Sequence, residues 1–227
     1  MASVMQKIVR EVLRPFRRRR RSPSHALNEL DLKIEPYLDF DNGFFIEAGA
    51  NDGKMYSNTL YFEERRNWTG ILVEPVQELA QQCITNRPNC VVECCALVSS
   101  DYESVDVEMT YCNMMSVVKG ALKTTEAEAN HIAAGCEIQN VESYQLKSSA
   151  RTLTSILDEH AVDHIDLLSL DVEGYEINAL NGIDFDRHAP RFMLIEARFR
   201  REIDACVCPR YKPVASFGNY DVLYELT

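Results

Sequence analysis

Short apolar runs alternate along the chain with stretches whose apolar residues recur at helical spacing. Five runs have the length of a strand and are apolar on both faces: residues 44–48, 70–73, 91–95, 165–171 and 191–196. Strands of this kind are typical of a parallel sheet that helices cover on both sides. The pattern therefore predicts an α/β fold with a mostly parallel central sheet.

Helix signals lie between these strands. Ser57 can cap a helix that runs to about residue 66, and Pro75 suits the first turn of a helix over residues 76–85. A third helix begins at Thr152 or Thr154, and a fourth spans residues 174–180. We expect Gly182 to end the fourth helix in a left-handed conformation.

Two other segments depart from the alternation. Residues 113–140 are polar and weakly helical, which is typical of a lid or a substrate loop rather than of a core element. Residues 211–227 form two extended segments that are separated by Phe217-Gly218-Asn219. The second pattern predicts an antiparallel hairpin at the end of the chain.

The first 25 residues have a composition of their own. They hold eight of the 24 Lys and Arg residues and one of the 35 acidic residues, and an arginine block at residues 17–21 follows apolar positions at helical spacing. A surface helix that contacts a membrane or a partner is one interpretation, and a solvated tail is the other. No run approaches the ~20 apolar residues of a membrane span. We predict a leader over residues 1–25 and one domain over residues 26–227.

The charge and the cysteines limit the class of protein. The whole chain has a net charge of −11, and because the first 25 residues carry about +7, the rest carries about −18. An acidic domain of this kind is poorly suited to nucleic acid as a partner. The eight cysteines include no C-x-x-C pair of the kind that binds zinc. Reduced cysteines without a secretory signal are typical of a cytoplasmic protein.

A glycine turn follows the first predicted strand, in the sequence Glu47-Ala48-Gly49-Ala50-Asn51-Asp52-Gly53. Such a turn lets the backbone approach a ligand closely, and the carboxylate of Glu74 after the second strand can accept hydrogen bonds from both hydroxyls of a ribose. The turn lacks the middle glycine of G-x-G-x-x-G, which serves the pyrophosphate of a dinucleotide. The turn therefore favours S-adenosylmethionine as the cofactor. A nicotinamide cofactor stays a less favoured alternative.

Five blocks in this order resemble the FkbM family of S-adenosylmethionine-dependent methyltransferases: "IEAGANDG", "WTGILVEP", "RTLTSILDEH", "IDLLSLDVEGYEINALNG" and "MLIEARF". The resemblance covers about residues 43–226. It implies a class I methyltransferase fold, which is a Rossmann-like three-layer sandwich with a mostly parallel seven-stranded sheet and an antiparallel terminal hairpin. It also implies S-adenosyl-L-methionine as the cofactor.

The resemblance implies cofactor contacts after successive strands. The implied residues are Glu47, Gly49, Ala50, Asn51, Gly53, Ser57, Glu74, Cys95, Ala96 and Asp171. Glu47 and the glycine turn would surround the methionine part, Glu74 would bind the ribose, and residues 95–97 would lie beside the adenine. Members of the family often have Asp where this chain has Glu47, whose side chain is one carbon longer.

Three carboxylates are the catalytic candidates: Asp171, Glu173 and Glu196. Methyl transfer needs an acceptor aligned with the sulfonium, and a hydroxyl acceptor must also lose a proton to a base. Asp171 is the first candidate for that base, with the other two as helpers or acceptor ligands. A divalent cation among the three is an open alternative, although no established metal motif is present. We expect Glu176 to be solvated.

We predict an O-methyltransferase that acts on a hydroxyl of a sugar, a glycolipid or a secondary metabolite. The sequence "SNTLYFEERRNWTGILVEP" also resembles Star-type proteins of animals, so an inactive trafficking or interaction adaptor is the alternative. "DVEG" stands where amine methyltransferases carry an Asn-Pro-Pro-aromatic signature, which disfavours methylation of nucleic-acid bases. Tyr56, Asn113 and Ser116 are expected near the pocket, and His160 and His164 are expected away from it.

Overall fold

The computed structural model describes residues 24–227, so the predicted leader lies outside the described residues except for its last two positions. A seven-stranded sheet in the order β10-β11-β9-β8-β1-β2-β3 forms the centre. Its strands are β1 (Phe44–Ala48), β2 (Thr69–Val73), β3 (Val91–Glu93), β8 (Leu167–Leu170), β9 (Phe192–Glu196), β10 (Tyr211–Phe217) and β11 (Asp221–Leu226). Strands β1, β2, β3, β8 and β9 run parallel to one another, whereas β11 runs antiparallel to both β9 and β10. The predicted fold class and the terminal hairpin are confirmed.

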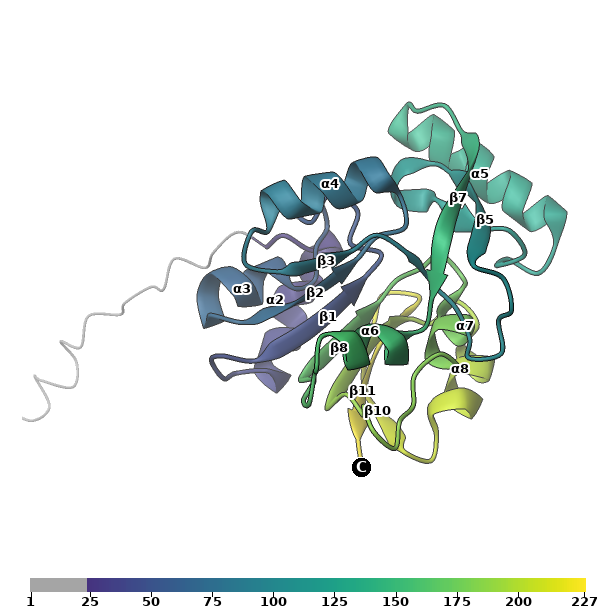
Figure 1. Ribbon diagram of the computed structural model, residues 1–227. Coiled ribbons are helices and arrows are strands. Elements are labelled where there is room, and N and C mark those ends of the chain that lie inside the picture. The colour runs from purple at the N-terminus through teal and green to yellow at the C-terminus, as the bar shows by residue number, and fades with distance from the viewer. Residues whose placement is uncertain (1–23) are drawn as a thin grey trace, which may run out of the picture.

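Helices cover both faces of this sheet, as Figure 1 shows. They are η1 (Leu27–Glu29), α2 (Leu30–Ile34), η2 (Glu35–Tyr37), α3 (Leu60–Arg66), α4 (Gln77–Asn86), α6 (Leu153–Glu159), α7 (Glu176–Leu180) and α8 (Arg200–Val207). Alternate residues of a strand point to opposite faces. Phe45 accordingly packs with residues of α2 and α3, and Ile46 packs with residues of α6, α7 and α8. The central strands β1, β2, β8 and β9 are mostly apolar because both of their faces are buried.

Two of the predicted caps contact the first turn of a helix, at α3 and at α6. The Ser57 hydroxyl accepts the N–H of Leu60 (3.1 Å), and the Thr152 hydroxyl accepts the N–H of Ser155 (3.1 Å). The expectation for Gly182 is wrong, because its backbone is not left-handed. Glycine is required there for space, since a Cβ would lie 2.1 Å from the carbonyl oxygen of Val98.

A second, smaller sheet stands beyond the carboxyl ends of the parallel strands, at the upper right of Figure 1. Its strands are β4 (Ala96–Leu97), β5 (Asp106–Tyr111), β6 (Val117–Val118) and β7 (Tyr144–Arg151), in the order β4-β7-β5-β6. The third strand, predicted over residues 91–95, is therefore shorter and ends at Glu93. Residues 91–93 stay in the large sheet, whereas 96–97 join the small one.

The segment over residues 113–140 is more regular than the sequence predicted. It contains η3 (Asn113–Met115), strand β6 and the 15-residue helix α5 (Thr125–Gln139). α5 packs closely on the end of β5, because a Cβ on Gly135 would lie 2.7 Å from the Cys112 sulfur. The Gln139 side chain also donates to the Cys112 carbonyl (3.0 Å). The interpretation of a loop is wrong, although the segment does border the pocket described below.

Two further findings concern the class of protein. None of the helices within residues 24–227 has the length and apolar character that a membrane span requires. All eight cysteines are free thiols, and burial raises the pKa of Cys83 and of Cys95 to about 12. At neutral pH both of these thiols are therefore protonated and unreactive.

Candidate active site

A cavity of about 440 Å³ opens at the carboxyl ends of the parallel strands. Its volume falls within the ~300–1,000 Å³ that is typical of small-molecule sites. β2 pairs with one edge of β1, and β8 pairs with the other edge. The strand order therefore reverses its direction between β1 and β8. Ligands of open α/β sheets bind at such a reversal. Small-sheet residues, Ile138 of α5 and the segment before α2 close the cavity from outside.

The first glycine of the turn is required by a close backbone approach. Gly49 has a φ of +84°, and a Cβ there would lie 1.9 Å from the carbonyl oxygen of Asp171. Any side chain would push the tips of β1 and β8 apart. Gly49 and Asp171 therefore face each other across the reversal, and both line the cavity.

Glu74, the residue after β2, is 5% exposed and lines the same cavity. Its two carboxylate oxygens accept the backbone N–H groups of Asn51 (2.8 Å) and Val76 (3.0 Å). A carboxylate has about four acceptor positions, so two remain for a ligand. Burial raises the pKa of Glu74 to about 7, against the opposing effect of the two N–H donors.

The small sheet is tied to the glycine turn by one direct contact. The Asn51 amide donates to the Asn113 side-chain oxygen (3.0 Å), and both residues line the cavity. Both also have positive φ values, 48° and 51°, which Asn tolerates better than most residues. Cys95 and Ala96 line the cavity where the chain passes from the large sheet to the small one.

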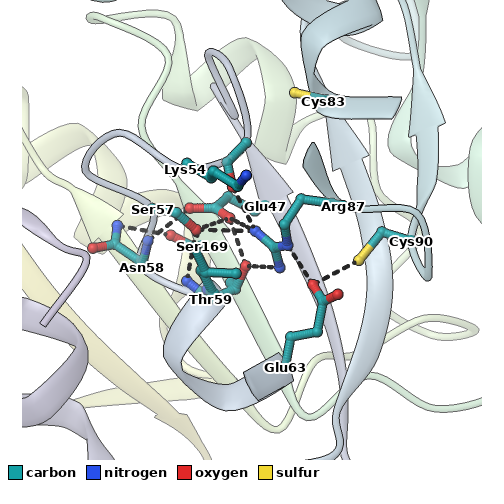
Figure 2. A network of polar contacts seen from close by, with 12 residues as sticks. Glu47, Lys54, Ser57, Asn58, Thr59, Glu63, Cys83, Arg87, Cys90 and Ser169 are labelled. Carbon is teal, nitrogen blue, oxygen red and sulfur yellow. Dashed lines mark hydrogen bonds and ion pairs between the residues drawn. The ribbon is translucent and has the colours of Figure 1, made fainter. Parts of the chain in front are cut away.

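Glu47 lies beside the cavity and does not line it. Its carboxylate accepts hydrogen bonds from the Ser57 hydroxyl (2.8 Å), the Asn58 N–H (2.7 Å) and the Thr59 hydroxyl (2.5 Å). The guanidinium of Arg87 is 3.6 Å away. Figure 2 shows it beside the Glu47 carboxylate. The position of this carboxylate does not support a direct contact with the methionine part of a cofactor. It supports a role in shaping the loop after β1.

Arg87 completes this buried network and was not predicted. The side chain is fully buried and donates to the Gly53 carbonyl (3.0 Å), to the two hydroxyls that also contact Glu47, and to Glu63. Figure 2 shows the guanidinium between the two carboxylates. Three predicted cofactor residues, Ala50, Gly53 and Ser57, lie in this part of the loop and do not line the cavity.

The three catalytic candidates do converge. Asp171, Glu173 and Glu196 all line the cavity. Arg198 donates to Glu173 (2.8 Å) and more weakly to Glu196 (3.3 Å). The His131 ring of α5 lies 3.4 Å from Glu173. Asp171, in contrast, is open to the cavity, and its carboxylate has no hydrogen bond or ion pair among residues 24–227.

Glu176 joins this group, so the expectation of a solvated side chain is wrong. It is 0% exposed, and one carboxylate oxygen accepts the N–H groups of Val172 (3.2 Å) and Gly174 (2.9 Å). Burial raises the pKa of Glu176 to about 7 and that of Glu173 to about 8. Desolvation by the surrounding cavity walls and the charge of Glu196 also raise the pKa of Asp171 well above its usual range.

An N-terminal segment that sequence reasoning missed also lines the cavity, through Leu27, Asn28 and Leu30. It is held by the buried carboxylate of Asp31, which accepts the N–H groups of His25 (2.8 Å) and Ala26 (3.3 Å). Further unpredicted lining residues include Met55, Met109, Met114, Met115, Ile138 and Asp221. Of the three pocket-border residues expected from the sequence, Tyr56, Asn113 and Ser116, all line the cavity.

The two histidines expected away from the cavity are outside its lining. His160 contacts Glu93 (2.5 Å), and His164 contacts Asp166 (2.8 Å). Both histidine rings therefore contact a carboxylate, in agreement with a surface or packing role.

Comparison with known families identifies the chain. The family model described as the methyltransferase FkbM domain matches residues 47–220. The chain belongs to the FkbM methyltransferase family. It is an S-adenosylmethionine-dependent methyltransferase, and the order of its seven strands with the antiparallel β11 is the class I arrangement that the family resemblance implied.

Three observations indicate that the cavity fits the family's cofactor. Gly49 leaves no room for a side chain, Glu74 keeps two acceptor positions open, and residues 95–96 provide a wall at the end of β3. Gly49, Asn51, Glu74, Cys95 and Ala96 are thus the residues that would hold S-adenosylmethionine. When bound, the cofactor supplies an activated methyl group on a sulfonium.

Two solved structures are similar to the chain at a low level. A TehB-like S-adenosylmethionine-dependent methyltransferase from Corynebacterium glutamicum has a TM-score of 0.42 at 8% identity, over 87% of this chain and 88% of that one. A candidate tRNA (m1A22) methyltransferase from Streptococcus pneumoniae has a TM-score of 0.40 at 8% identity, over 86% of this chain and 68% of that one. A search of curated proteins gave no match.

Proposed function

We propose that this methyltransferase transfers the methyl group to a hydroxyl oxygen of a sugar, a glycolipid or a secondary metabolite, with Asp171 as the general base. The observation that carries the proposal is the free carboxylate of Asp171, which is open to the cavity at the tip of β8. Glu173 and Glu196 are held by Arg198, and one oxygen of Glu176 is held by backbone N–H groups. Asp171 is thus the carboxylate best placed to accept a proton from an acceptor.

The charge of the cavity favours a neutral or cationic acceptor. Five carboxylates line it, those of Glu74, Asp171, Glu173, Glu196 and Asp221, and Arg198 contacts two of them. An acceptor with phosphate or carboxylate groups would be repelled from this surface. The exposed apolar side chains at its rim, Leu27, Met55, Tyr56 and Ile138, suit an acceptor that also carries apolar surface.

The chain's own residues have separable tasks in this reaction. The Gly49 turn and Glu74 would fix the cofactor, and the rim would exclude water and orient the acceptor, which can supply much of the rate acceleration. Asp171 would accept the proton of the acceptor hydroxyl, a contribution of typically 10²–10⁴-fold. Glu173 and Glu196 would bind neighbouring hydroxyls of the acceptor.

A screen for methyl transfer tests the proposed function. The protein is incubated with methyl-labelled S-adenosylmethionine and fractions of neutral glycans, glycolipids and phenolic metabolites. We expect label in a methyl ether, which resists mild base, whereas a methyl ester would be hydrolysed. Label in an amine or an ester would contradict hydroxyl methylation, and label in no fraction would favour the Star-type adaptor alternative.

Asp171→Asn separates catalysis from cofactor binding. We expect kcat to fall by about 10²–10⁴-fold, because the amide cannot accept the proton. The affinity for S-adenosylhomocysteine should stay within about threefold, since Asn is nearly isosteric and leaves the Gly49 contact unchanged. Kinetics and calorimetry measure the two quantities. An unchanged kcat would exclude Asp171 as the base.

Cofactor binding should also depend on pH through Glu74. Ribose hydroxyls would donate to the ionised carboxylate, so binding favours the deprotonated form. Because burial raises the pKa of Glu74 to about 7, the affinity for S-adenosylhomocysteine should rise from pH 5.5 to pH 7.5 and level off above it. Below pH 7 the slope should approach tenfold per pH unit. Calorimetry over this range should show a smaller slope for Glu74→Gln, and equal slopes would contradict the assignment.

A further inference from the structure

Three carboxylates from separate positions in the chain form a compact group beside the cavity, which Asp171 and Glu196 line. Asp171 follows β8, Glu176 begins α7 and Glu196 ends β9. One oxygen from each lies within 4.8 Å of the other two. Two oxygens bound to one hard cation at about 2.0–2.6 Å can be at most about 4–5 Å apart, so this spacing suits a shared cation.

An unpaired buried atom within this group is the second observation. Glu176 is 0% exposed, and its Oε1 atom accepts two backbone N–H groups. Its Oε2 atom is buried and has no hydrogen-bond partner among the described residues. A buried carboxylate oxygen without a partner is costly, and native structures leave few such atoms unless a ligand or an ion pairs with them.

The backbone of the loop 171–176 separates this group from Glu173. Glu173 and Gly174 both have positive φ values, 54° and 96°. Consecutive left-handed residues fold the loop back on itself, and Glu173 contacts Arg198 and His131 while Glu176 returns to the group. The candidate ligands are therefore Asp171, Glu176 and Glu196, which corrects the set with Glu173 that the sequence left open.

The charges are not balanced by the protein. Arg198 contacts Glu173 and Glu196, whereas neither Asp171 nor Glu176 has an ion pair within residues 24–227. Asp221 adds a further carboxylate directly opposite Glu196 in the β9–β11 pairing, where like charges destabilise a sheet. Oxygen-only ligands select hard divalent cations such as Mg²⁺, Mn²⁺ or Ca²⁺.

The geometry points to a binding site for a hard divalent cation of the Mg²⁺ class, with Asp171, Glu176 and Glu196 as its ligands. The role of the cation rests on the proposed function, since an acceptor hydroxyl that coordinates such an ion loses its proton more easily. One oxygen of Asp171 would bind the cation, and the other would stay free to accept the proton. Binding itself does not depend on that role. The bound cation would offset part of the negative charge of these carboxylates, so they would repel the acceptor's oxygen less as the proton leaves.

Titration of the full chain with Mn²⁺ tests the site without cofactor or acceptor. Electron paramagnetic resonance reports free Mn²⁺, and we expect one equivalent to bind with a dissociation constant below about 1 mM. Glu176→Gln should weaken Mn²⁺ affinity at least tenfold, because Gln fills the same space and can still accept the N–H groups of Val172 and Gly174. Asp221→Asn is the matched control, since it removes a cavity carboxylate outside the group, and its effect should stay below threefold.

The outcomes separate this inference from the proposed function. No stoichiometric binding of Mn²⁺ by the wild-type protein would overturn the site. Unchanged affinity in Glu176→Gln, or an equal loss in Asp221→Asn, would also overturn it and indicate general charge attraction. If Glu176→Gln does not fold by circular dichroism, Glu196→Gln takes its place with the same expected loss. Methyl transfer that persists in EDTA would leave the proposed function intact while refuting the role of the cation.

Discussion

Glu74→Gln is expected to weaken the binding of S-adenosylhomocysteine by roughly 30- to 150-fold at pH 8, as measured by calorimetry. The substitution removes the charge and one acceptor from a buried carboxylate, and hydrogen bonds to a charged group contribute about 2–3 kcal/mol. The amide keeps the size of the side chain and can still accept one of the two N–H groups that Glu74 now pairs. The loss should therefore come from the ligand contact and not from unfolding.

Glu78→Gln is the control for this prediction. Glu78 is an exposed carboxylate on α4, four residues further along the chain and outside the cavity lining. Removing it changes the net charge by the same amount, so its effect on affinity should be less than twofold. Equal losses in the two variants would indicate a general electrostatic effect and would remove Glu74 from the cofactor site.

Arg87→Met is expected to lower the free energy of unfolding by about 3–5 kcal/mol, as measured by urea denaturation. Met fills much of the same space but leaves Glu47 and Glu63 without their cation in a buried network. The Gly53 carbonyl and two hydroxyls also lose a donor. These groups shape the loop after β1. The folded Arg87→Met protein should therefore also bind S-adenosylhomocysteine more weakly than the wild type does.

Arg65→Met provides the comparison on the surface. Arg65 lies on α3 and is exposed, and substitutions at such positions usually change stability by less than about 0.5 kcal/mol. A similar small change for Arg87→Met would show that the network around Glu47 contributes little. It would then restore a direct cofactor contact as the simplest role for Glu47.

The large sheet could be predicted because a strand that is buried on both faces appears in the sequence as a short run of apolar residues. Residues 44–48 were predicted as a strand, and β1 has those bounds. The helices after β1 and β2 were found within a few residues, since Ser57 and Pro75 mark their starts by local chemistry. Local signals of this kind do not depend on the rest of the fold.

The small sheet and α5 could not be predicted for the opposite reason. α5 has 15 residues, of which only Gly135 is buried, so it has no apolar stripe at helical spacing. Strand β7 has one buried residue, Ser148. These elements are defined by what they pack against, and a single sequence holds little information on that.

The site shows the same division between local and distant signals. Gly49, Glu74 and Asp171 were identified because each directly follows a strand, where the edge of the sheet collects ligand-binding groups. Glu47 was assigned to the cofactor on the same reasoning, yet its partner Arg87 is 40 positions away in the chain and holds it in the loop network. Glu176 was placed in solvent by helical spacing. The left-handed residues at 173 and 174 turn it inward instead.

A crystal structure with S-adenosylhomocysteine tests the central claim most directly, namely that the cavity between β1 and β8 is the cofactor site. The account predicts both ribose hydroxyls on the Glu74 carboxylate, the adenine beside Cys95 and Ala96, and the sulfur directed toward the open side of Asp171. Density for the ligand outside this cavity, or inside it with the ribose turned away from Glu74, would contradict the account.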